Sequence, residues 1–196
     1  MAGEVVRAVL NHVWTALEPL EHPCAVMGGV ALALWNHPRA TRDVDILIGV
    51  DPNSFDAVAK QLLAHECRPK ATPPVVAIGS HHLAQFLYTP PDEFYDVQFD
   101  LWLAESELQK SALVRRVSCR IPGADRPIEA LKPDDLILFK LVASRAIDRA
   151  DAAMLLRENR DVIDFAYLRN WVAKLSLVAE FREIWREAFP DAALPE

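Results

Sequence analysis

The sequence contains few cysteines, no long hydrophobic run and no excess of basic residues. Its three cysteines, Cys24, Cys67 and Cys119, are far apart and lack the paired spacing of a zinc site or a disulfide framework. No apolar run approaches the ~20 residues needed to span a bilayer, and the first residues lack the basic, apolar and small-residue order of a signal peptide. We therefore expect a soluble cytoplasmic protein with reduced thiols and no membrane partner.

Acidic residues outnumber basic ones, since 28 Asp and Glu stand against 21 Lys and Arg, for a formal net charge of -7. This balance excludes a surface coated with positive charge for non-specific nucleic-acid binding. A nucleic-acid acceptor would need a local basic patch, and one modest set of arginines is present: Arg115, Arg116, Arg120 and Arg126. Scattered solvated charge is the simpler interpretation of that set.

Hydrophobic periodicity divides the chain into a strand-bearing part and a helical part. With 52% apolar residues in 196, it can bury one good core and a helical appendage. Residues 3–18 and 53–65 have helical spacing, as does nearly everything after Pro133. Strand-like patterns are found at 24–27, at 43–50 and over most of 73–103. We expect an α/β (α+β) protein whose short mixed β-sheet is flanked by helices, with a C-terminal helical region.

An Asp-x-Asp pair at the start of a predicted strand is the first sign of chemistry. Asp43 and Asp45 open the segment DVDILIGV, and side chains two apart on a strand share one face. Clustered carboxylates are the ligands with which proteins hold Mg²⁺ against a triphosphate. A third carboxylate can come from YDVQFDLWL, where Asp96 and Asp100 have the same parity. Asp100 is favoured because it lies deeper in the apolar run, where an unpartnered carboxylate is costly.

A glycine pair, Gly28-Gly29, follows the predicted strand at 24–27. Glycines at this point let backbone amides approach an anion without interference from a Cβ atom. A lone Gly-Gly is weak evidence. Here it is followed by thirteen residues and then by Asp-x-Asp, with a further carboxylate in a later strand, and that combination is far more specific.

The segment GGVALALWNHPRATRDVDILI resembles the motif of the DNA polymerase β-like nucleotidyltransferases. Within that superfamily the run RATRDVD, from Arg39 to Asp45, is similar to the Arg-x-Thr-x-Asp-x-Asp form of abortive-infection toxin-type enzymes. The family often has Ser at the second glycine, so Gly29 lacks a hydroxyl that could touch phosphate. The resemblance covers most of the chain, but only the glycine pair and the Asp-x-Asp region are specific.

A stretch rich in proline and charge, IPGADRPIEALKP near 122–133, indicates a boundary between a catalytic domain over residues 1–125 and a C-terminal helical region over 126–196. The resemblance implies two Mg²⁺ ions held by Asp43, Asp45 and Asp100, with Asp100 also helping to deprotonate the attacking hydroxyl. The nucleoside triphosphate would lie against a set of residues from both parts of the chain: Gly28, Gly29, Arg39, Thr41 and Lys140. Asp148 or Asp151 would support Lys140.

We therefore expect a Mg²⁺-dependent enzyme that transfers a nucleoside monophosphate from a triphosphate to a hydroxyl. The acceptor stays open between a transfer RNA end, a protein side chain and a small molecule such as an aminoglycoside. The type of relative also suggests a component of a toxin–antitoxin system, which is an association only.

Simpler interpretations stand beside these. The fold could persist as a catalytically silent nucleotide-binding or regulatory module, or the Asp-x-Asp could be a coincidence in an unrelated α/β protein. Lys140 could reach solvent from an apolar helix, and Arg39 and Thr41 could be ordinary loop residues. The adjacent His81 and His82 point to opposite faces of a strand and do not suggest a metal site. The five tryptophans fit core positions better than stacking platforms.

Overall fold

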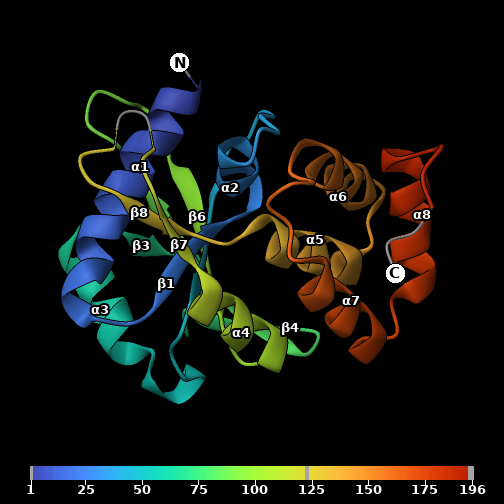
Figure 1. Ribbon diagram of the computed structural model, residues 1–196. Helices are drawn as coiled ribbons and strands as arrows, with labels where there is room; N and C mark the ends of the chain where they lie inside the picture. The colour runs from blue at the N-terminus through green and yellow to red at the C-terminus, as the bar shows by residue number, and fades with distance from the viewer. Residues whose placement is uncertain (1, 122–123, 194–196) are drawn as a thin grey trace.

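The computed structural model describes residues 2–121 and 124–193, and within these ranges eight strands form one mixed sheet. Helices lie on both sides of it: in Figure 1, α1 and α3 are to the left and α5 to α8 are to the right. The sequence prediction of an α/β fold with a mixed sheet and a C-terminal helical region is confirmed.

The sheet has the order β3-β5-β6-β2-β1-β8-β7, with β4 paired to β5 outside this path. The central strand β2 pairs antiparallel with β1 and parallel with β6. The strand bounds are β1 Cys24–Met27, β2 Val44–Ile48, β3 Arg68–Pro69, β4 Val75–Ile78, β5 His81–Tyr88, β6 Val97–Leu103, β7 Val117–Cys119 and β8 Ile128–Ala130.

The helices follow the predicted periodicity. Helix α1 buries Val9, Leu10 and Val13 completely or nearly so, and it packs on α3, β2 and β6. The α-helix bounds are α1 Ala2–Leu17, α2 Gly28–Leu34, α3 Asp56–Ala64, α4 Glu107–Arg115, α5 Pro133–Ala143, α6 Ala146–Glu158, α7 Phe165–Lys174 and α8 Val178–Ala188. Two short 3₁₀ turns are added, at Glu18–Leu20 and Pro52–Ser54.

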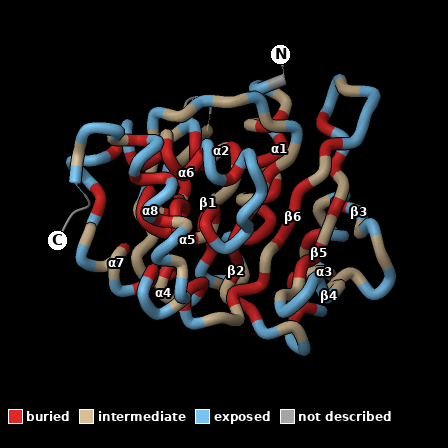
Figure 2. The backbone as a smooth tube through the Cα atoms, turned by 90° about the vertical axis from the view of Figure 1, so that its right-hand side faces the viewer, coloured by how far each residue is buried: buried red, intermediate tan, exposed pale blue. Residues whose placement is uncertain are grey.

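The core runs along the central strands, as the buried tube of β1, β2 and β6 shows in Figure 2. In β2, Val44, Ile46, Leu47 and Ile48 are all fully buried, and α1, α2 and α4 contact this strand. Asp45 is the one residue of β2 that stays partly exposed. A carboxylate in the middle of an apolar strand therefore has a reason beyond packing.

Local differences from the sequence prediction have simple causes. Helix α4 was not predicted, although its start carries a capping box: Ser106 accepts from the amide of Gln109, and the Gln109 side chain accepts from the amide of Ser106. Pro69, which lies outside the segments predicted as strands, is in the two-residue edge strand β3, where proline is tolerated. The helix predicted over 53–65 begins at Asp56, with Asp51 capping the preceding turn.

The sheet continues past residue 125, because β8 pairs parallel with β1 and the amide of Leu131 donates to Val26. Helix α5 then leaves the sheet, touches α2, and packs with α6 and α7. The division into a catalytic domain and a helical region thus remains a proposal, with the last strand of the sheet lying beyond its boundary.

A buried polar cluster joins α4 to the helical region. Arg115, from the end of α4, pairs with Asp134 and Asp135 in the first turn of α5, and its guanidinium lies 3.4 Å from the centre of the Tyr167 ring. The Tyr167 hydroxyl donates to Asp135 at 2.6 Å. Burial raises the pKa of Asp135 to about 6, while the Tyr167 hydrogen bond and the Arg115 charge oppose the rise.

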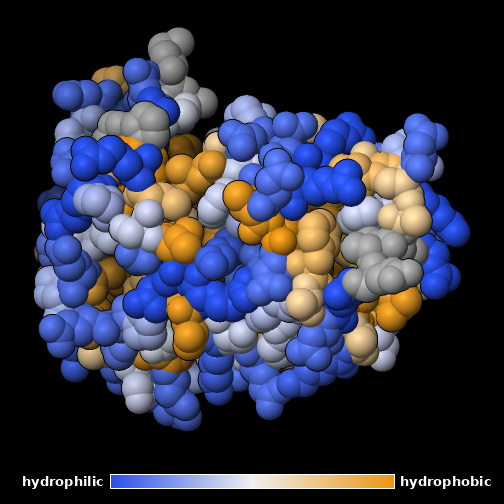
Figure 3. Space-filling view, viewed as in Figure 1, coloured by the Kyte–Doolittle hydropathy of each residue, from blue (hydrophilic) through white to orange (hydrophobic). Residues whose placement is uncertain are grey.

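The surface shows no broad hydrophobic area on the face seen in Figure 3, where hydrophobic atoms are divided into small patches by hydrophilic ones. Among the described residues, no helix combines the length and the apolar character that a membrane span requires.

Candidate functional site

Asp45 and Asp100 are direct neighbours in the sheet. They are register partners on the parallel strands β2 and β6, which lie about 4.8 Å apart as adjacent strands do. Asp43 directly precedes β2, and the Thr41 hydroxyl fixes it by donating to its Oδ1 at 2.8 Å. The structure therefore brings the three predicted carboxylates to one region of the sheet.

Negative charge at this point is not fully compensated. Burial raises the pKa of Asp45 to about 6, the charges of Asp43 and Asp100 add to the rise, and Trp102 and Lys140 oppose it. The pKa of Asp100 is also raised by burial, against hydrogen bonds from Gln98 and Gln85. Closely spaced carboxylates that disfavour each other's ionised form fit a divalent cation, which would neutralise them.

The carboxylates are not gathered into a closed ligand cage. Over residues 2–121 and 124–193, no three His, Cys, Asp or Glu side chains lie close enough together to hold a metal ion as they stand. Oδ1 of Asp43 accepts a hydrogen bond from Thr41, and Oδ1 of Asp45 accepts one from Trp102. A shared metal would therefore require these side chains to exchange their present partners for the ion.

The glycine pair is in close contact with the acidic residues. Gly28 starts α2 at a φ of +61°, and a Cβ atom added there would lie 1.9 Å from Oδ2 of Asp45. A Cβ on Gly29 would lie 2.6 Å from Oγ1 of Thr41. Only glycines allow the start of α2 to approach β2 and the preceding loop this closely.

Asp96, the second choice for the third carboxylate, lies outside the site. It precedes β6, is exposed, and accepts hydrogen bonds from Arg68 and from Thr89. β6 begins at Val97, between Asp96 and Asp100. Residues four apart on one strand point to the same face, so the alternation of side chains along the strand did not distinguish the two aspartates. The register of β6 against β2 does.

Lys140 does not project freely toward solvent. Its Nζ lies 2.8 Å from Oδ1 of Asp148 and 2.8 Å from Oδ2 of Asp151. Asp151 also contacts His37 Nε2 at 3.0 Å and Arg39 Nε at 3.4 Å. The helical region thereby holds the loop that carries Arg39 and Thr41, and Lys140 is near enough to Asp45 to lower its pKa.

Arg145, at the N-cap of α6, joins the same cluster. Its Nε lies 2.6 Å from Oδ2 of Asp148. Burial favours a higher pKa of Asp148, but hydrogen bonds from Arg145 and Lys140 outweigh it and lower that pKa. The negative charge of Asp45 in turn contributes to a raised pKa of Arg145. Arg39, Lys140 and Arg145 thus form a cationic cluster, and the charges of Lys140 and Arg145 interact with that of Asp45.

Several residues of this region were not singled out in the sequence. Trp102, assigned to the core, donates its indole N–H toward Asp45 at 3.4 Å. Gln85 and Gln98 donate to Asp100, and His37 contacts Asp151. Gln98 and Trp102 could have been found from the sequence, because each is two residues from Asp100 on the predicted strand and so shares its face. The partners of Gln85 and His37 depend on long-range pairing.

The other sequence candidates have local partners. Arg115 pairs with Asp134, Arg126 with Glu18, and Arg116 lies 4.0 Å from Glu129. His82 Nδ1 lies 2.9 Å from Glu105. These contacts favour structural roles for Arg115, Arg116, Arg126 and His82.

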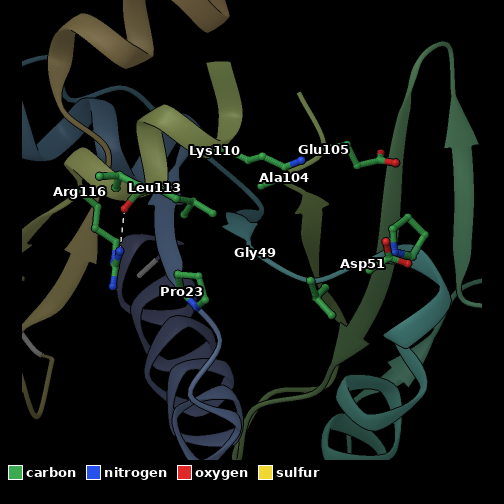
Figure 4. A pocket seen from close by; sticks show the side chains of 11 residues that line it. Pro23, Gly49, Asp51, Ala104, Glu105, Lys110, Leu113 and Arg116 are labelled. Carbon is green, nitrogen blue, oxygen red and sulfur yellow. Dashed lines mark hydrogen bonds between the residues drawn. The ribbon is translucent and has the colours of Figure 1, made fainter. Parts of the chain in front are cut away.

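A cavity of about 640 Å³ lies at the opposite end of β2 and β6 from the aspartates. It is lined by residues that follow the two strands, Gly49 and Ala104 among them, and Figure 4 shows Lys110 and Glu105 above it with Pro23 and Asp51 below. None of the predicted site residues lines it. The cavity is thus separate from the acidic site.

The comparisons with known proteins agree with this geometry. A family described as nucleotidyl transferase AbiEii toxin, type IV toxin–antitoxin system, matches residues 10–195. Among solved structures, an antigenic nucleotidyltransferase-like protein from Paracoccidioides brasiliensis is 17% identical with a TM-score of 0.54, covering 97% of this chain and 99% of that one. No curated protein sequence matches the chain.

The antibiotic-resistance factor ANT(2'')-Ia is similar in two structures. Its solution structure is 13% identical with a TM-score of 0.58, covering 95% of this chain and 98% of that one. Its crystal structure in complex with adenylyl-2''-tobramycin has a TM-score of 0.51 at 13% identity, covering 88% of this chain and 97% of that one. At such identities the likeness is one of fold.

Proposed function

The chain belongs to the AbiEii family of nucleotidyl transferases, the toxins of type IV toxin–antitoxin systems, and on that premise we propose that it transfers a nucleoside monophosphate from a triphosphate to a hydroxyl acceptor, with pyrophosphate leaving. The observation that carries the proposal is the register pairing of Asp45 with Asp100, with Asp43 two residues away. Side chains from two parallel strands and one loop thereby supply the three carboxylates that this chemistry needs.

Asp43, Asp45 and Asp100 are the residues that would hold two Mg²⁺ ions. The raised pKa values of Asp45 and Asp100, to which the charge of Asp43 contributes, support this assignment, because a divalent cation would offset both burial and repulsion between the carboxylates. Bound Mg²⁺ would neutralise charge on the triphosphate and favour ionisation of the attacking hydroxyl. In this proposal, Asp100 also accepts the proton of that hydroxyl.

The triphosphate would lie between the glycine pair and the cationic cluster. Gly28 and Gly29 bring backbone N–H groups to the edge where Asp45 lies, and Thr41 orients Asp43 from the adjoining loop. Arg39 and Lys140 come from the opposite side, anchored by Asp151. Anchored cations are preorganised for the anionic leaving group and lose little mobility when it binds.

The acceptor is left open between an RNA end, a protein side chain and a small molecule. The adenylylated tobramycin bound to ANT(2'')-Ia illustrates the last class on a similar fold. The family description supports a role in a toxin–antitoxin system.

The test is transfer of label from each α-labelled nucleoside triphosphate, with Mg²⁺, to total RNA, to lysate protein or to an aminoglycoside. The wild-type protein should label one acceptor class, and Asp43→Asn, Asp45→Asn and Asp100→Asn should reduce labelling to background. Asp96→Asn is the matched control and should retain activity, because Asp96 pairs with Arg68 outside the site. Absence of transfer, with no Mg²⁺-dependent nucleotide binding by calorimetry, would refute the enzyme assignment. Retained binding without transfer would indicate a silent nucleotide-binding module.

A further inference from the structure

The carboxylate of Asp100 is held by two glutamine amides. Gln98 Nε2 donates to Oδ1 at 2.8 Å, and Gln85 Nε2 lies 3.2 Å from Oδ1 and 3.3 Å from Oδ2. Asp100 is only 8% exposed, so these amides replace water around a buried charge. Neither glutamine has a part in the nucleotide site described above.

Strand geometry places both amides on the same face as Asp100. Gln98 precedes Asp100 by two residues on β6. Gln85 is the register partner of Asp100 on the antiparallel strand β5. Gln85 lies on the side of Asp100 that is away from β2, since the sheet order is β5-β6-β2, whereas Gln98 lies beside Asp100 along β6 itself. Neither glutamine therefore stands between Asp100 and Asp45, its register partner on β2.

Lys70 fixes the orientation of one amide. Its Nζ donates to Oε1 of Gln98 at 2.6 Å, and its backbone amide donates to the carbonyl of Gln85 at 2.9 Å. A lysine ammonium group can only donate, so Gln98 must turn its oxygen to Lys70 and its NH₂ to Asp100. The exposed Lys70 thus sets which way the buried hydrogen bond runs.

The contacts are unevenly divided between the two carboxylate oxygens. Within the described part of the chain, Oδ1 accepts from both glutamines, whereas Oδ2 accepts only from Gln85. Each carboxylate oxygen has about two lone-pair sites. Oδ2 therefore keeps capacity for a metal ion or for the proton of an attacking hydroxyl, while Oδ1 is used for positioning.

We propose that Gln85 and Gln98 are positioning residues that hold the Asp100 carboxylate in its metal-binding orientation, with Lys70 fixing Gln98. This inference rests on the proposed function, since it assigns Asp100 to the metal site. Groups that orient a metal ligand from behind commonly change metal affinity by about 10- to 100-fold when removed. A purely structural polar pair on a strand surface would not change it.

The experiment measures Mn²⁺ affinity of the full chain by electron paramagnetic resonance of the free ion, with a non-hydrolysable nucleoside triphosphate analogue present. Gln98→Leu and Gln85→Leu should each weaken Mn²⁺ binding by about 10-fold or more. Lys70→Met should weaken it less, and Lys70→Arg should restore it by keeping a donor to Gln98. Gln61→Leu, on α3, is the matched control and should bind as the wild type does.

The decisive arm repeats Gln98→Leu and Gln85→Leu in an Asp100→Asn background. If the glutamines act through Asp100, they cause no further loss there. Unchanged Mn²⁺ affinity in the glutamine variants, or an equal loss with and without Asp100, would overturn the inference while leaving the metal site intact. If Asp100→Asn itself leaves Mn²⁺ affinity unchanged, the proposed metal site fails, and the inference fails with it. Urea unfolding midpoints identify any variant that does not fold, and the exposed Lys70 variants then carry the test.

Discussion

A Cβ atom on Gly28 would lie 1.9 Å from Oδ2 of Asp45, so the first residue of α2 and the central acidic residue of β2 occupy adjoining space. The backbone of Gly28 also has a φ of +61°, which L side chains rarely adopt. The glycine motif and the acidic motif are therefore interlocked parts of one structure, and changes in one should be felt at the other.

Gly28→Ala should abolish nucleotidyl transfer by displacing the Asp45 carboxylate. It should also lower the free energy of unfolding by more than the roughly 1 to 2 kcal/mol that a left-handed conformation costs alone. Gly79→Ala is the matched control, because Gly79 also has a φ of +61° but no atom within 4 Å of the added Cβ. Urea unfolding and Mn²⁺ binding of both variants check this, and equal behaviour of the two would contradict it.

Gly29 and Thr41 should be coupled in stability. A Cβ at Gly29 would lie 2.6 Å from both Cβ and Oγ1 of Thr41, so Gly29→Ser alone should destabilise the fold. Combining it with Thr41→Gly removes the clash, and a double-mutant cycle should show a favourable coupling of about 1 to 3 kcal/mol. Unfolding free energies of the four proteins measure it. Strictly additive losses would mean that the loop moves aside instead.

Lys140→Met should destabilise the protein strongly, because Asp148 and Asp151 lose the buried cation that lies 2.8 Å from each. Removing one partner of a buried ion pair costs about 3 to 5 kcal/mol. Lys174→Met is the matched control, since Lys174 pairs with Glu107 at the exposed surface and should change stability little. Urea unfolding of both variants decides the matter, and a mild effect of Lys140→Met would argue that Arg39 and Arg145 suffice to hold the two aspartates.

Asp135 should make the fold more stable as the pH falls. Its pKa is raised to about 6 by burial, against about 3.9 in an unfolded chain, so the folded protein binds the proton more tightly. Between pH 7 and pH 4 its contribution to the free energy of unfolding should rise by about 2 to 3 kcal/mol, and this is lost again as the pH rises through 6.

Asp135→Asn isolates that contribution, because all other titrating groups are shared with the wild type. The variant should be the more stable protein at pH 7, and the difference should shrink toward pH 4.5. Urea unfolding at the two pH values measures it. A difference that does not depend on pH would show that Arg115 and Tyr167 keep Asp135 ionised throughout.

Much of the fold was readable from periodicity. The spacing of Val9, Leu10 and Val13 located α1, and the apolar run after Asp45 located β2, because burial on one helical face or on both faces of a strand imposes a local pattern. Helix α4 was missed although Ser106 and Gln109 mark its start. The edge strand at Pro69 was missed because two residues are too few to show a period.

The sequence by itself determined the family motif, the two-residue spacing of Asp43 and Asp45, and the two choices for a third carboxylate, since each depends on spacing along a few residues. Only the tertiary structure pairs Asp100, and not Asp96, with Asp45, shows that Lys140 contacts both Asp148 and Asp151, and brings Gln85 and Trp102 to the acidic site. These facts depend on strand register and on helix packing between residues far apart in the chain. A one-residue slip in β6 would have turned Asp100 to the other face of the sheet without changing any local pattern.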